Sequence, residues 1–558
     1  MTSSTDRIPD ADETPAEDLR AVAAKIREMA EAGRVDELIT LVVSLLQRMR
    51  SENSQLTQRL HMELRKAYGR SSEKVDASQL ALLFDALTEQ EVPDSAKACI
   101  KVPDSPPLHP EGDDQAQGKK PAKKQRRPGR LPLPENLERE PRDVRVADEE
   151  RVCPVCGKQK QCIGHVVSEI LEFVPAHFKV IEERREKLAC PEGCEGSVSV
   201  AASEKIYDRG RPGPGLLAHL VVSKFQDSLP LYRQSQIFRR SGLRLSPTTL
   251  GLWAAFAIEC IQPIAMRILR WALRAHCLQV DDTGLRVLDR DHPKGVKRGH
   301  MWCHVGDRLW VAFRYAPTWE AKFPALLLGQ FKGFIQVDDY KGYEARVDRP
   351  EGKEPLVPPD RRLACGMHIR RRFEQAADGG DARGAVAMAY FRRLYEVERA
   401  CKDEGLDPDA RLARRQAESL PVLEELNQWV DQIHPTLVPD TPLYKATRYA
   451  QHQRDFFQRC FTDGRFEIDN GEVERQIRRV ALGRKNYLFA GSDSAAERIA
   501  MAYTVLGTCH LNDVDPQAYL SDVIVKLQGN WPQSRIDELL PPQWNEARQG
   551  KTKTEKPE

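Results

Sequence analysis

Two pairs of neighbouring aspartates are the residues in this chain best suited to chemistry. Asp281-Asp282 ends the run CLQVDD and Asp338-Asp339 ends the run GFIQVDD, and both runs are short, apolar and strand-like. Carboxylates at the ends of neighbouring strands can lie close together, and no basic residue beside them in the sequence neutralises them. Such a group is costly unless a cation lies between its members. Hard oxygen ligands of this kind suit Mg²⁺, which binds one or two carboxylates together with substrate phosphate.

A third carboxylate is expected from a helix that begins near Asp469-Asn470-Gly471. Asp469 is predicted to cap this helix, with Glu472 closing a capping box. Glu474 then lies in the early turns, followed by basic residues suited to phosphate: Arg475, Arg478, Arg479, Arg484 and Lys485. A glutamate beside such a basic helix fits an acid that works on a phosphodiester. The alternative is a surface salt bridge at i,i+4 spacing, the usual state of a glutamate on an arginine-rich helix.

A cysteine cluster predicts a metal site. Five of the thirteen cysteines lie within residues 153–194, and four of them form two close pairs separated by strand-like runs. Four thiolates on two turns are typical of a closed, structural zinc ribbon. The predicted ligands are Cys153, Cys156, Cys190 and Cys194. The gap between the pairs is longer than the usual template, so Cys162 or His165 is a possible replacement ligand, and five reduced thiols without metal are the alternative.

A basic run lies inside the proline-rich stretch 93–142. Residues 119–130 read KKPAKKQRRPGR, in which seven of twelve residues are basic and none is acidic. Each lysine or arginine that meets a phosphate releases counterions, so a flexible cationic arm is suited to DNA. A solvated linker whose charges only maintain solubility explains the run equally well. The residues concerned are Lys119, Lys120, Lys123, Lys124, Arg126, Arg127 and Arg130.

Length and composition limit the classes of protein. The chain has 558 residues, enough for several domains. It has 85 Lys and Arg against 83 Asp and Glu, so a net charge of +2 identifies no partner. No run of 18 apolar residues exists, which excludes a spanning helix. The acidic N-terminus has no secretory signal, so the cysteines are not expected to form a disulfide framework.

The elements that must position these residues follow one another along the chain. Residues 205–272 look helical, with a break at Pro230, and form either a DNA-docking unit or a plain spacer. Strands begin near residue 276 with a hairpin turn at Gly306-Asp307. The expected segments are a disordered tail (1–30), a helical, imperfect coiled-coil segment (31–75), a basic proline-rich linker (93–142), a zinc-binding segment (143–204), a helical segment (205–272), a strand-rich core (273–500) with a helical insertion (about 374–460), and a helical C-terminal segment (501–558).

Several ordered blocks resemble the insertion sequence 66 family of bacterial transposases, from about residue 35 to the end. The carboxylate motifs with RKNYLFAGSD look like the family's DDE motifs, and LRKAYGRSSEK looks like the end of its coiled coil. CPVCG resembles its zinc-binding segment, and HLNDVDPQAYL its C-terminal segment. Cys365 and His368, followed by Arg371 and Arg372, resemble its C-x-x-H-x-R-R block. We interpret Cys365 and His368 as structural or as substrate contacts.

The resemblance implies a multidomain α/β protein with a ribonuclease-H-like catalytic core whose triad is Asp281, Asp338 and Glu474. The family usually has Asp-Glu-Thr-Pro and Asp-Gly-Tyr where this chain has doubled aspartates. Asp282 and Asp339 are therefore rival ligands, because adjacent strand residues face opposite ways. The implied activity is DNA cleavage and strand transfer with Mg²⁺ or Mn²⁺ held by the triad.

The implied partner is double-stranded DNA, both transposon ends and target, with end binding assigned to residues 1–270. A homo-oligomer is expected because two ends must meet, and accessory proteins of the same element are possible. The expected location is the bacterial cytoplasm, at the nucleoid, and not a membrane. One alternative is a non-enzymatic zinc-ribbon and coiled-coil DNA-binding regulator, which leaves the carboxylates without a role. Another is a related ribonuclease-H-like nuclease, which does not need the N-terminal modules.

Overall fold

The computed structural model describes residues 212–554 apart from 329–330 and 350–351, residues 77–100 apart from 86 and 88–90, and short pieces within 27–53, 178–200 and 206–207. It divides into one unit of residues 1–104 and 204–558 and a second unit of residues 105–203. In the second unit, strands β1 (Lys187–Leu188) and β2 (Ser199–Val200) pair antiparallel. Residues 1–26 of the expected tail, the basic arm and the four predicted zinc ligands lie outside the described residues, as does most of the expected coiled coil. Residues 27–30, which the sequence predicts as the end of the disordered tail, are instead helical.

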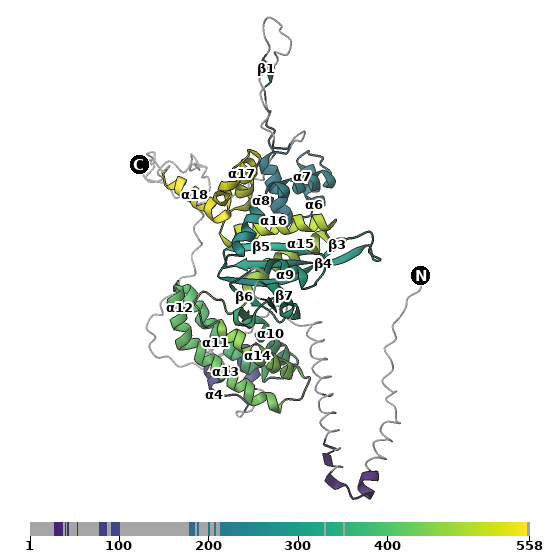
Figure 1. The fold of residues 1–558 in the computed structure, drawn as a ribbon, viewed down its shortest axis with the longest axis vertical. Coiled ribbons are helices and arrows are strands. Elements are labelled where there is room, and N and C mark those ends of the chain that lie inside the picture. Colours follow the sequence, from purple (N-terminus) through teal and green to yellow (C-terminus); the bar gives the residue numbers. More distant parts are fainter. Residues whose placement is uncertain are drawn as a thin grey trace, which may run out of the picture. The chain divides into compact units, whose positions relative to one another are not determined.

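A five-stranded mixed sheet carries both aspartate pairs (Figure 1). Its strands are β3 (Cys277–Leu288), β4 (Val296–Gly306), β5 (Trp310–Ala316), β6 (Phe334–Val337) and β9 (Arg362–Ala364). They are arranged in the order β5-β4-β3-β6-β9. Strands β3, β4 and β5 form an antiparallel meander. On the other side of β3, strand β6 pairs parallel to β3, and β9 pairs parallel to β6. The predicted strands and the predicted hairpin turn after Gly306 are therefore present. The prediction that the first strand ends at Asp281-Asp282 is wrong, because pairing with β4 continues β3 to Leu288 and places this pair inside the strand.

Helices from the C-terminal part of the chain close one edge of this sheet. Strands β3 to β5 pack against α8 (Gln262–Ala272), α15 (Gly471–Tyr487) and α16 (Asp493–Leu511). The backbone N–H groups of Val311 and Phe313, on edge strand β5, donate to the Oγ1 atoms of Thr508 and Thr504 on α16, at 3.1 and 2.8 Å. An edge strand leaves such groups unpaired, so these buried threonines cover the edge.

The predicted helical segment consists of three short helices ahead of α8. They are α5 (Pro214–Phe225), α6 (Leu231–Arg240) and α7 (Pro247–Cys260). The helix break at Pro230 is confirmed, since Pro230 is the residue before α6. Ser246 caps α7 by accepting the N–H of Thr249 at 3.0 Å, and Leu220, Phe238, Leu250 and Ala254 form the small core. Among the described residues no single helix is long and apolar enough to span a membrane, although the bent pair α7 and α8 meets that test together.

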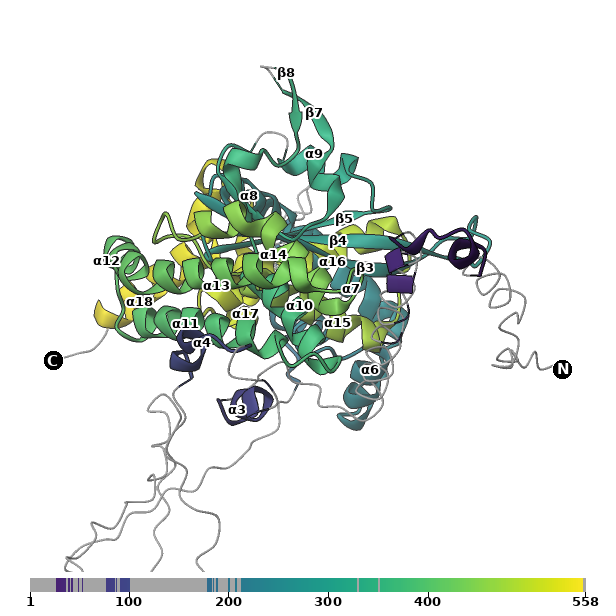
Figure 2. The same ribbon diagram turned by 90° about the horizontal axis from the view of Figure 1, so that it is seen from below.

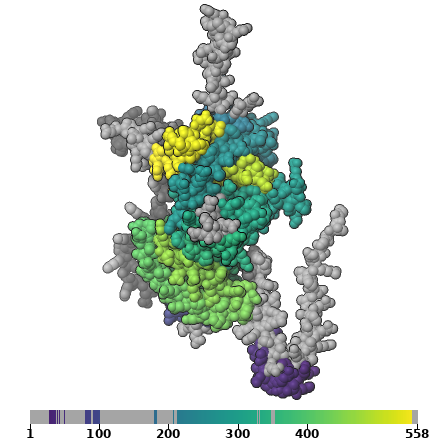
Figure 3. Space-filling view, in the orientation of Figure 1, coloured from purple at the N-terminus to yellow at the C-terminus, as the bar shows by residue number. Residues whose placement is uncertain are grey.

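A helical insertion follows β9 and occupies the lower part of Figure 1. Its helices are α10 (Gly366–Asp378), α11 (Gly384–Asp403), α12 (Pro408–Arg414), a π-helical turn (Arg415–Ser419), α13 (Leu420–Ile433), a 3-10 turn (His434–Thr436) and α14 (Pro442–Arg459). Helices α10, α11, α13 and α14 pack against one another (Figure 2) around Phe373, Phe391 and Trp429. Figure 3 shows the insertion as one continuous lobe. It begins eight residues earlier than the sequence predicts, at Gly366.

Two helices from the N-terminal part of the chain pack on this insertion. Helices α3 (Ala77–Asp85) and α4 (Asp94–Ala98) both contact α11, and the hydroxyls of Ser95 and Tyr390 are hydrogen-bonded at 2.6 Å. Ala96 and Cys99 are buried there. Helix α4 therefore occupies the first residues of the stretch that the sequence predicts as linker, because its apolar side chains find a partner surface on α11.

The remaining elements lie around the sheet and at the C-terminus. They are α9 (Lys322–Leu328), the hairpin β7 (Arg346–Arg349) and β8 (Gly352–Pro355), the 3-10 turns Lys341–Glu344, Pro359–Arg361 and Gln533–Leu539, and helices α17 (Pro516–Gln528) and α18 (Pro541–Thr554). Helix α17 packs against α5. The C-terminal segment is helical as predicted.

Candidate active site

The tetrapeptide Gln-Val-Asp-Asp occurs twice, at residues 279–282 on β3 and 336–339 at the end of β6. Gln279 and Gln336 are partners in the parallel register, and Gln279 Nε2 donates to Gln336 Oε1 at 2.9 Å. Side chains two residues apart share one face of a strand, so Asp281 and Asp338 follow the paired glutamines on the same face. The two buried glutamines are absent from the predicted site, and the repeated tetrapeptide is the sequence signal for them.

Asp281 lies on β3 just beyond its pairing with β6. Its Oδ1 accepts the N–H of Asp282 at 2.8 Å. Burial raises the pKa of Asp281 to about 7, against the lowering effect of that hydrogen bond, and the negative charges of Asp338 and Glu474 add to the rise. Both other members of the predicted triad therefore act electrostatically on Asp281, as like charges in one site do.

Asp338 is the first residue after β6. Its Oδ1 accepts the N–H of Tyr340 at 3.1 Å. Burial raises the pKa of Asp338, while this hydrogen bond and the charge of His368 lower it. The backbone just after β6 thus fixes one carboxylate oxygen of Asp338 through this hydrogen bond.

Glu474 lies in the first turns of α15, whose start is attached to the sheet. Asn470, the N-cap residue, donates its backbone N–H to Cys365 Sγ at 3.2 Å, and its Nδ2 lies 3.4 Å from the carbonyl oxygen of Val280. Gln279 Nε2 also donates to the carbonyl of Asp469 at 2.8 Å. The start of the helix therefore lies beside the residue before Asp281, which brings Glu474 to the site.

The predicted capping box is wrong. Asp469 Oδ1 does accept the N–H of Gly471, at 2.7 Å. Glu472, however, accepts from Arg475 at 2.6 Å and from Gln476 at 2.9 Å instead of turning back to the cap. The cationic partner one turn on competes for the carboxylate, and a charge-assisted hydrogen bond is stronger than one to a backbone N–H.

Two residues of α10 face Glu474. His368 Nε2 lies 3.7 Å from Glu474 Oε1, and Arg371 Nη2 lies 3.5 Å from Oε2. Burial lowers the pKa of His368, whereas the carboxylates of Glu474 and Asp338 raise it. The C-x-x-H-x-R-R block therefore reaches the site through His368 and Arg371, and Cys365 acts at its edge by accepting from Asn470.

The rival aspartates are engaged elsewhere. Asp282 Oδ2 lies 2.6 Å from His300 Nδ1, and Oδ1 accepts from Trp319 Nε1 at 3.1 Å. Asp339 Oδ1 accepts from Gln453 Nε2 at 2.7 Å and from an arginine of β9. Asp282 thus binds the β4 side of the sheet and Asp339 binds the insertion, so both rival aspartates have hydrogen-bond partners outside the predicted triad.

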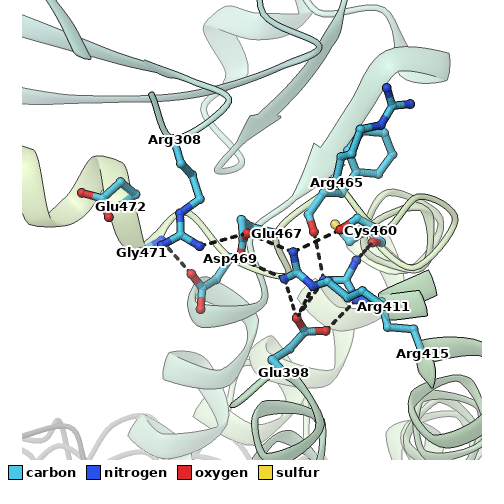
Figure 4. Close-up of polar contacts among 12 residues, drawn as sticks. Arg308, Glu398, Arg411, Arg415, Cys460, Arg465, Glu467, Asp469, Gly471 and Glu472 are labelled. Atoms are coloured by element: carbon cyan, nitrogen blue, oxygen red, sulfur yellow. Dashed lines mark hydrogen bonds and ion pairs between the residues drawn. The ribbon is translucent and has the colours of Figure 1, made fainter. Parts of the chain in front are cut away.

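An ion-pair network ties the insertion to the segment that precedes α15 (Figure 4). Arg415 is 0% exposed and donates twice to the carboxylate of Glu398, at 2.6 and 2.9 Å. Arg411 contacts both Glu398 and Glu467. Arg308, in the turn between β4 and β5, lies 3.2 Å from Glu467. The insertion, the hairpin and the segment leading to Glu474 are therefore cross-linked, which no local sequence pattern indicates.

The basic residues of α15 have two kinds of environment. Arg475 pairs with Glu472, and Arg479 Nη1 donates to Gln226 at 3.3 Å. Arg484 donates to Thr283 Oγ1 at 2.9 Å and to the carbonyl of Gly284, so it braces β3 beside Asp281. Exposed side chains at the helix surface belong to Arg475, Arg478 and Lys485.

The carboxylates fit a hard cation in chemistry. The charges of Asp338 and Glu474 both act on the buried Asp281, and burial with like charge is costly unless a cation is present. Glu474 Oε1 is buried without a hydrogen-bond donor, as an oxygen kept for another ligand is. Within the described ranges, no three His, Cys, Asp or Glu side chains are close enough to hold a metal ion as they stand.

Four protein-family models match the chain in order. The model described as "Transposase IS66 family" matches residues 209–498, and "IS66 C-terminal element" matches residues 504–541. "Zinc-finger binding domain of transposase IS66" matches residues 150–195, and "Transposase C of IS166 homeodomain" matches residues 55–142. The first match spans more than half of the chain, and the chain therefore belongs to the Transposase IS66 family. Membership confirms the resemblance and indicates a DNA-processing protein with a zinc-binding segment.

Related proteins occur in Sinorhizobium fredii. Uncharacterized protein y4hP is 33% identical over 444 residues, covering 76% of this chain and 78% of the relative. Uncharacterized protein y4jD is 32% identical over 424 residues, covering 74% and 81%. No solved structure matches the chain.

Proposed function

We propose that this protein is a DNA transposase that cuts insertion-sequence ends and joins them to target DNA through Asp281, Asp338 and Glu474. The observation that carries the proposal is the hydrogen bonding of Gln279, which joins β3 to Gln336 of β6 at 2.9 Å and to the carbonyl of Asp469 before α15 at 2.8 Å, so that the three elements bearing the acids are tied together. Family membership supplies the substrate class, DNA.

The sheet order supports a ribonuclease-H-like core. An antiparallel meander of three strands followed by two parallel strands places the first strand in the middle, next to β6. The first acid lies on that central strand, the second at the end of the neighbouring parallel strand, and the third on a later helix. The three proposed catalytic carboxylates thus come from three elements, with the insertion between the second and third along the chain.

The chemistry assigned to the site is phosphoryl transfer. Two Mg²⁺ or Mn²⁺ ions, when bound, would activate the attacking oxygen and stabilise the leaving oxygen. Asp281, Asp338 and Glu474 would hold these ions. Water attacks phosphorus, the bond to the 3′-oxygen breaks, and the products are a 5′-phosphate and a 3′-hydroxyl. That hydroxyl then attacks a target phosphodiester, so no covalent protein–DNA intermediate is needed.

Binding of the ends is assigned to residues 1–270. The zinc-finger and homeodomain matches support DNA contact in this part of the chain, and the basic arm at residues 119–130 is proposed to contact phosphates. The exposed Arg478 and Lys485 would add contacts beside the site. Because two ends must meet, we assign a homo-oligomeric assembly, acting at the bacterial nucleoid.

The test is cleavage of supercoiled DNA that carries both element ends, in Mg²⁺ or Mn²⁺. Glu474→Gln and Asp281→Asn each remove one negative charge, and each should slow cleavage and strand transfer roughly a thousandfold or more. End binding should remain nearly intact. Asp282→Asn should be much milder, and Glu497→Gln, on the exposed surface of α16, serves as the matched control.

Each result separates the candidate functions. Wild-type cleavage by Glu474→Gln would remove that residue from the triad. Nicking without joined products would indicate a nuclease, and end binding without metal-dependent cleavage would indicate a regulator.

A further inference from the structure

A half-exposed tryptophan lies beside the carboxylates. Trp319, in the loop after β5, is 51% exposed. Its Nε1 donates to Asp282 Oδ1 at 3.1 Å, and Asp282 adjoins Asp281. A large apolar ring is thus kept at the surface while its polar atom is fixed next to the first acid of the site.

Tyr340, which follows strand β6, contacts the same indole ring of Trp319. Its hydroxyl donates to the carbonyl of Trp319 at 2.6 Å, and its backbone N–H donates to Asp338. The two rings are stacked with centroids 4.5 Å apart and planes inclined by 25°. Tyr340 also contacts Trp302 and Tyr343, and both are buried. The aromatic pair is therefore backed by the core and attached both to Asp282 within β3 and to Asp338 after β6.

A third contact fixes the tilt of the indole. The ring of His300 lies 5.8 Å from that of Trp319 at an angle of 14°, and His300 Nδ1 contacts the other oxygen of Asp282. A ring held by neighbours on two strands has little freedom left to lose, so a flat ligand that stacks on it pays little ordering cost.

A nucleobase suits this surface better than a phosphate does. The carboxylates nearby repel an uncompensated anion, whereas a base is neutral and presents a flat π-face to an aromatic ring. Bases inside a duplex have both faces covered, so only an unpaired or terminal base can use such a ring.

On the assumption that the site cuts DNA, we propose that Trp319, backed by Tyr340, stacks on an unpaired base next to the phosphodiester that is cut. The stack would hold the strand end against Asp281 and Asp338. Trp319 is then a positioning residue that selects distorted or frayed DNA at the element's end.

The test measures cleavage rates for each combination of protein variant and DNA variant, with the full-length protein and Mg²⁺, as in a double-mutant cycle. One DNA has normal element ends, and others carry an abasic nucleotide on one or the other side of the cleaved phosphate. On normal DNA, Trp319→Ala should cleave about tenfold or more slowly than the wild type. On the DNA that lacks the stacking base, the two proteins should cleave at equal rates, because no base remains to bind.

Two variants keep the result interpretable. Trp319→Phe retains the aromatic face and loses the hydrogen bond to Asp282, so it should keep most of the rate on normal DNA. Leu326→Ala, at an 80% exposed position on α9, should match the wild type on every DNA.

Three outcomes overturn the inference. In the first, the ratio of wild-type to Trp319→Ala cleavage rates is the same on all DNAs. In the second, Trp319→Phe is as slow as Trp319→Ala. In the third, the wild type shows no metal-dependent cleavage at all. The last outcome also removes the proposed function. With the first two, a dead Glu474→Gln variant leaves the proposed function standing.

Discussion

Arg415 is a fully buried cation that holds the segment leading to Glu474. Besides Glu398, it donates to three backbone carbonyls of the connection between α14 and α15, at 3.1, 3.0 and 2.9 Å (Figure 4). These carbonyls belong to Cys460, Asp463 and Phe466. One guanidinium therefore satisfies five acceptors, which a planar fork of five N–H donors can do and an ammonium cannot.

The effect of removing Arg415 can be estimated from these contacts. Breaking a buried ion pair by deleting one partner costs about 3–5 kcal/mol, and each buried carbonyl left without a donor costs about 1 kcal/mol or more. The contributions share one network and do not add fully, and Arg411 still neutralises part of Glu398. We expect Arg415→Met to lower the free energy of unfolding of the insertion by about 4 kcal/mol. Arg415→Lys should cost about half as much.

Hydrogen exchange measured by mass spectrometry is the suitable assay, because a multidomain chain has no single unfolding free energy. In Arg415→Met, amides of residues 460–474 and of α11 should exchange faster, and DNA cleavage should fall because the start of α15 is loosened. Arg393→Met is the matched control. Its side chain is 33% exposed and pairs with Glu396 and Glu418, so its cost should stay below about 1 kcal/mol. Unchanged exchange of residues 460–474 in Arg415→Met would refute this account of the network.

Two further predictions concern metal and pH. Purified protein should carry about one zinc per chain, and Cys153→Ser should lower that content and destabilise the zinc-binding segment. Full zinc content in a double Cys190→Ser, Cys194→Ser variant would instead assign Cys162 and His165 as zinc ligands. Burial lowers the pKa of His304 from 6.5 to about 4, so the unfolded chain takes up a proton before the folded chain does as pH falls. The contribution of His304 to the free energy of unfolding should therefore be complete above pH 6.5 and fall by about 3 kcal/mol on acidification to pH 4. In urea titrations at several pH values, His304→Gln should differ from the wild type by the loss of that pH-dependent contribution, whereas the same dependence of stability on pH in both proteins would contradict the assignment.

Local patterns predicted the elements that depend on sequence neighbours. The helix break at Pro230 depends on that residue itself and lies next to the start of α6, and the strands that carry or precede Asp281 and Asp338 were predicted from apolar runs. The capping box at Asp469 failed because it competes with an ion pair one turn further along the same helix, between Glu472 and Arg475. Sequence patterns do not rank two local partners that are both within reach of one carboxylate.

The extent of the insertion was predicted less well. Its helices were expected from about residue 374, but α10 begins at Gly366 because Cys365 lies against Asn470, a contact across more than a hundred residues. Helix α4 was expected to be linker because it lies at the start of the proline-rich stretch 93–142. Its few apolar side chains, such as Ala96, are buried on α11, a surface that the sequence does not display.

From the sequence alone one obtains the family, the acidic residues, the cysteine pairs and the order of strands and helices. Tertiary structure was needed to show that Asp281 and Asp338 lie on the face of the paired glutamines, while Asp282 and Asp339 turn to His300 and Gln453. It was also needed to bring His368, Arg371 and Trp319 to the carboxylates. The reason is physical. Residue type and periodicity are local properties, whereas register, packing and the pairing of buried charges depend on which distant segments come together.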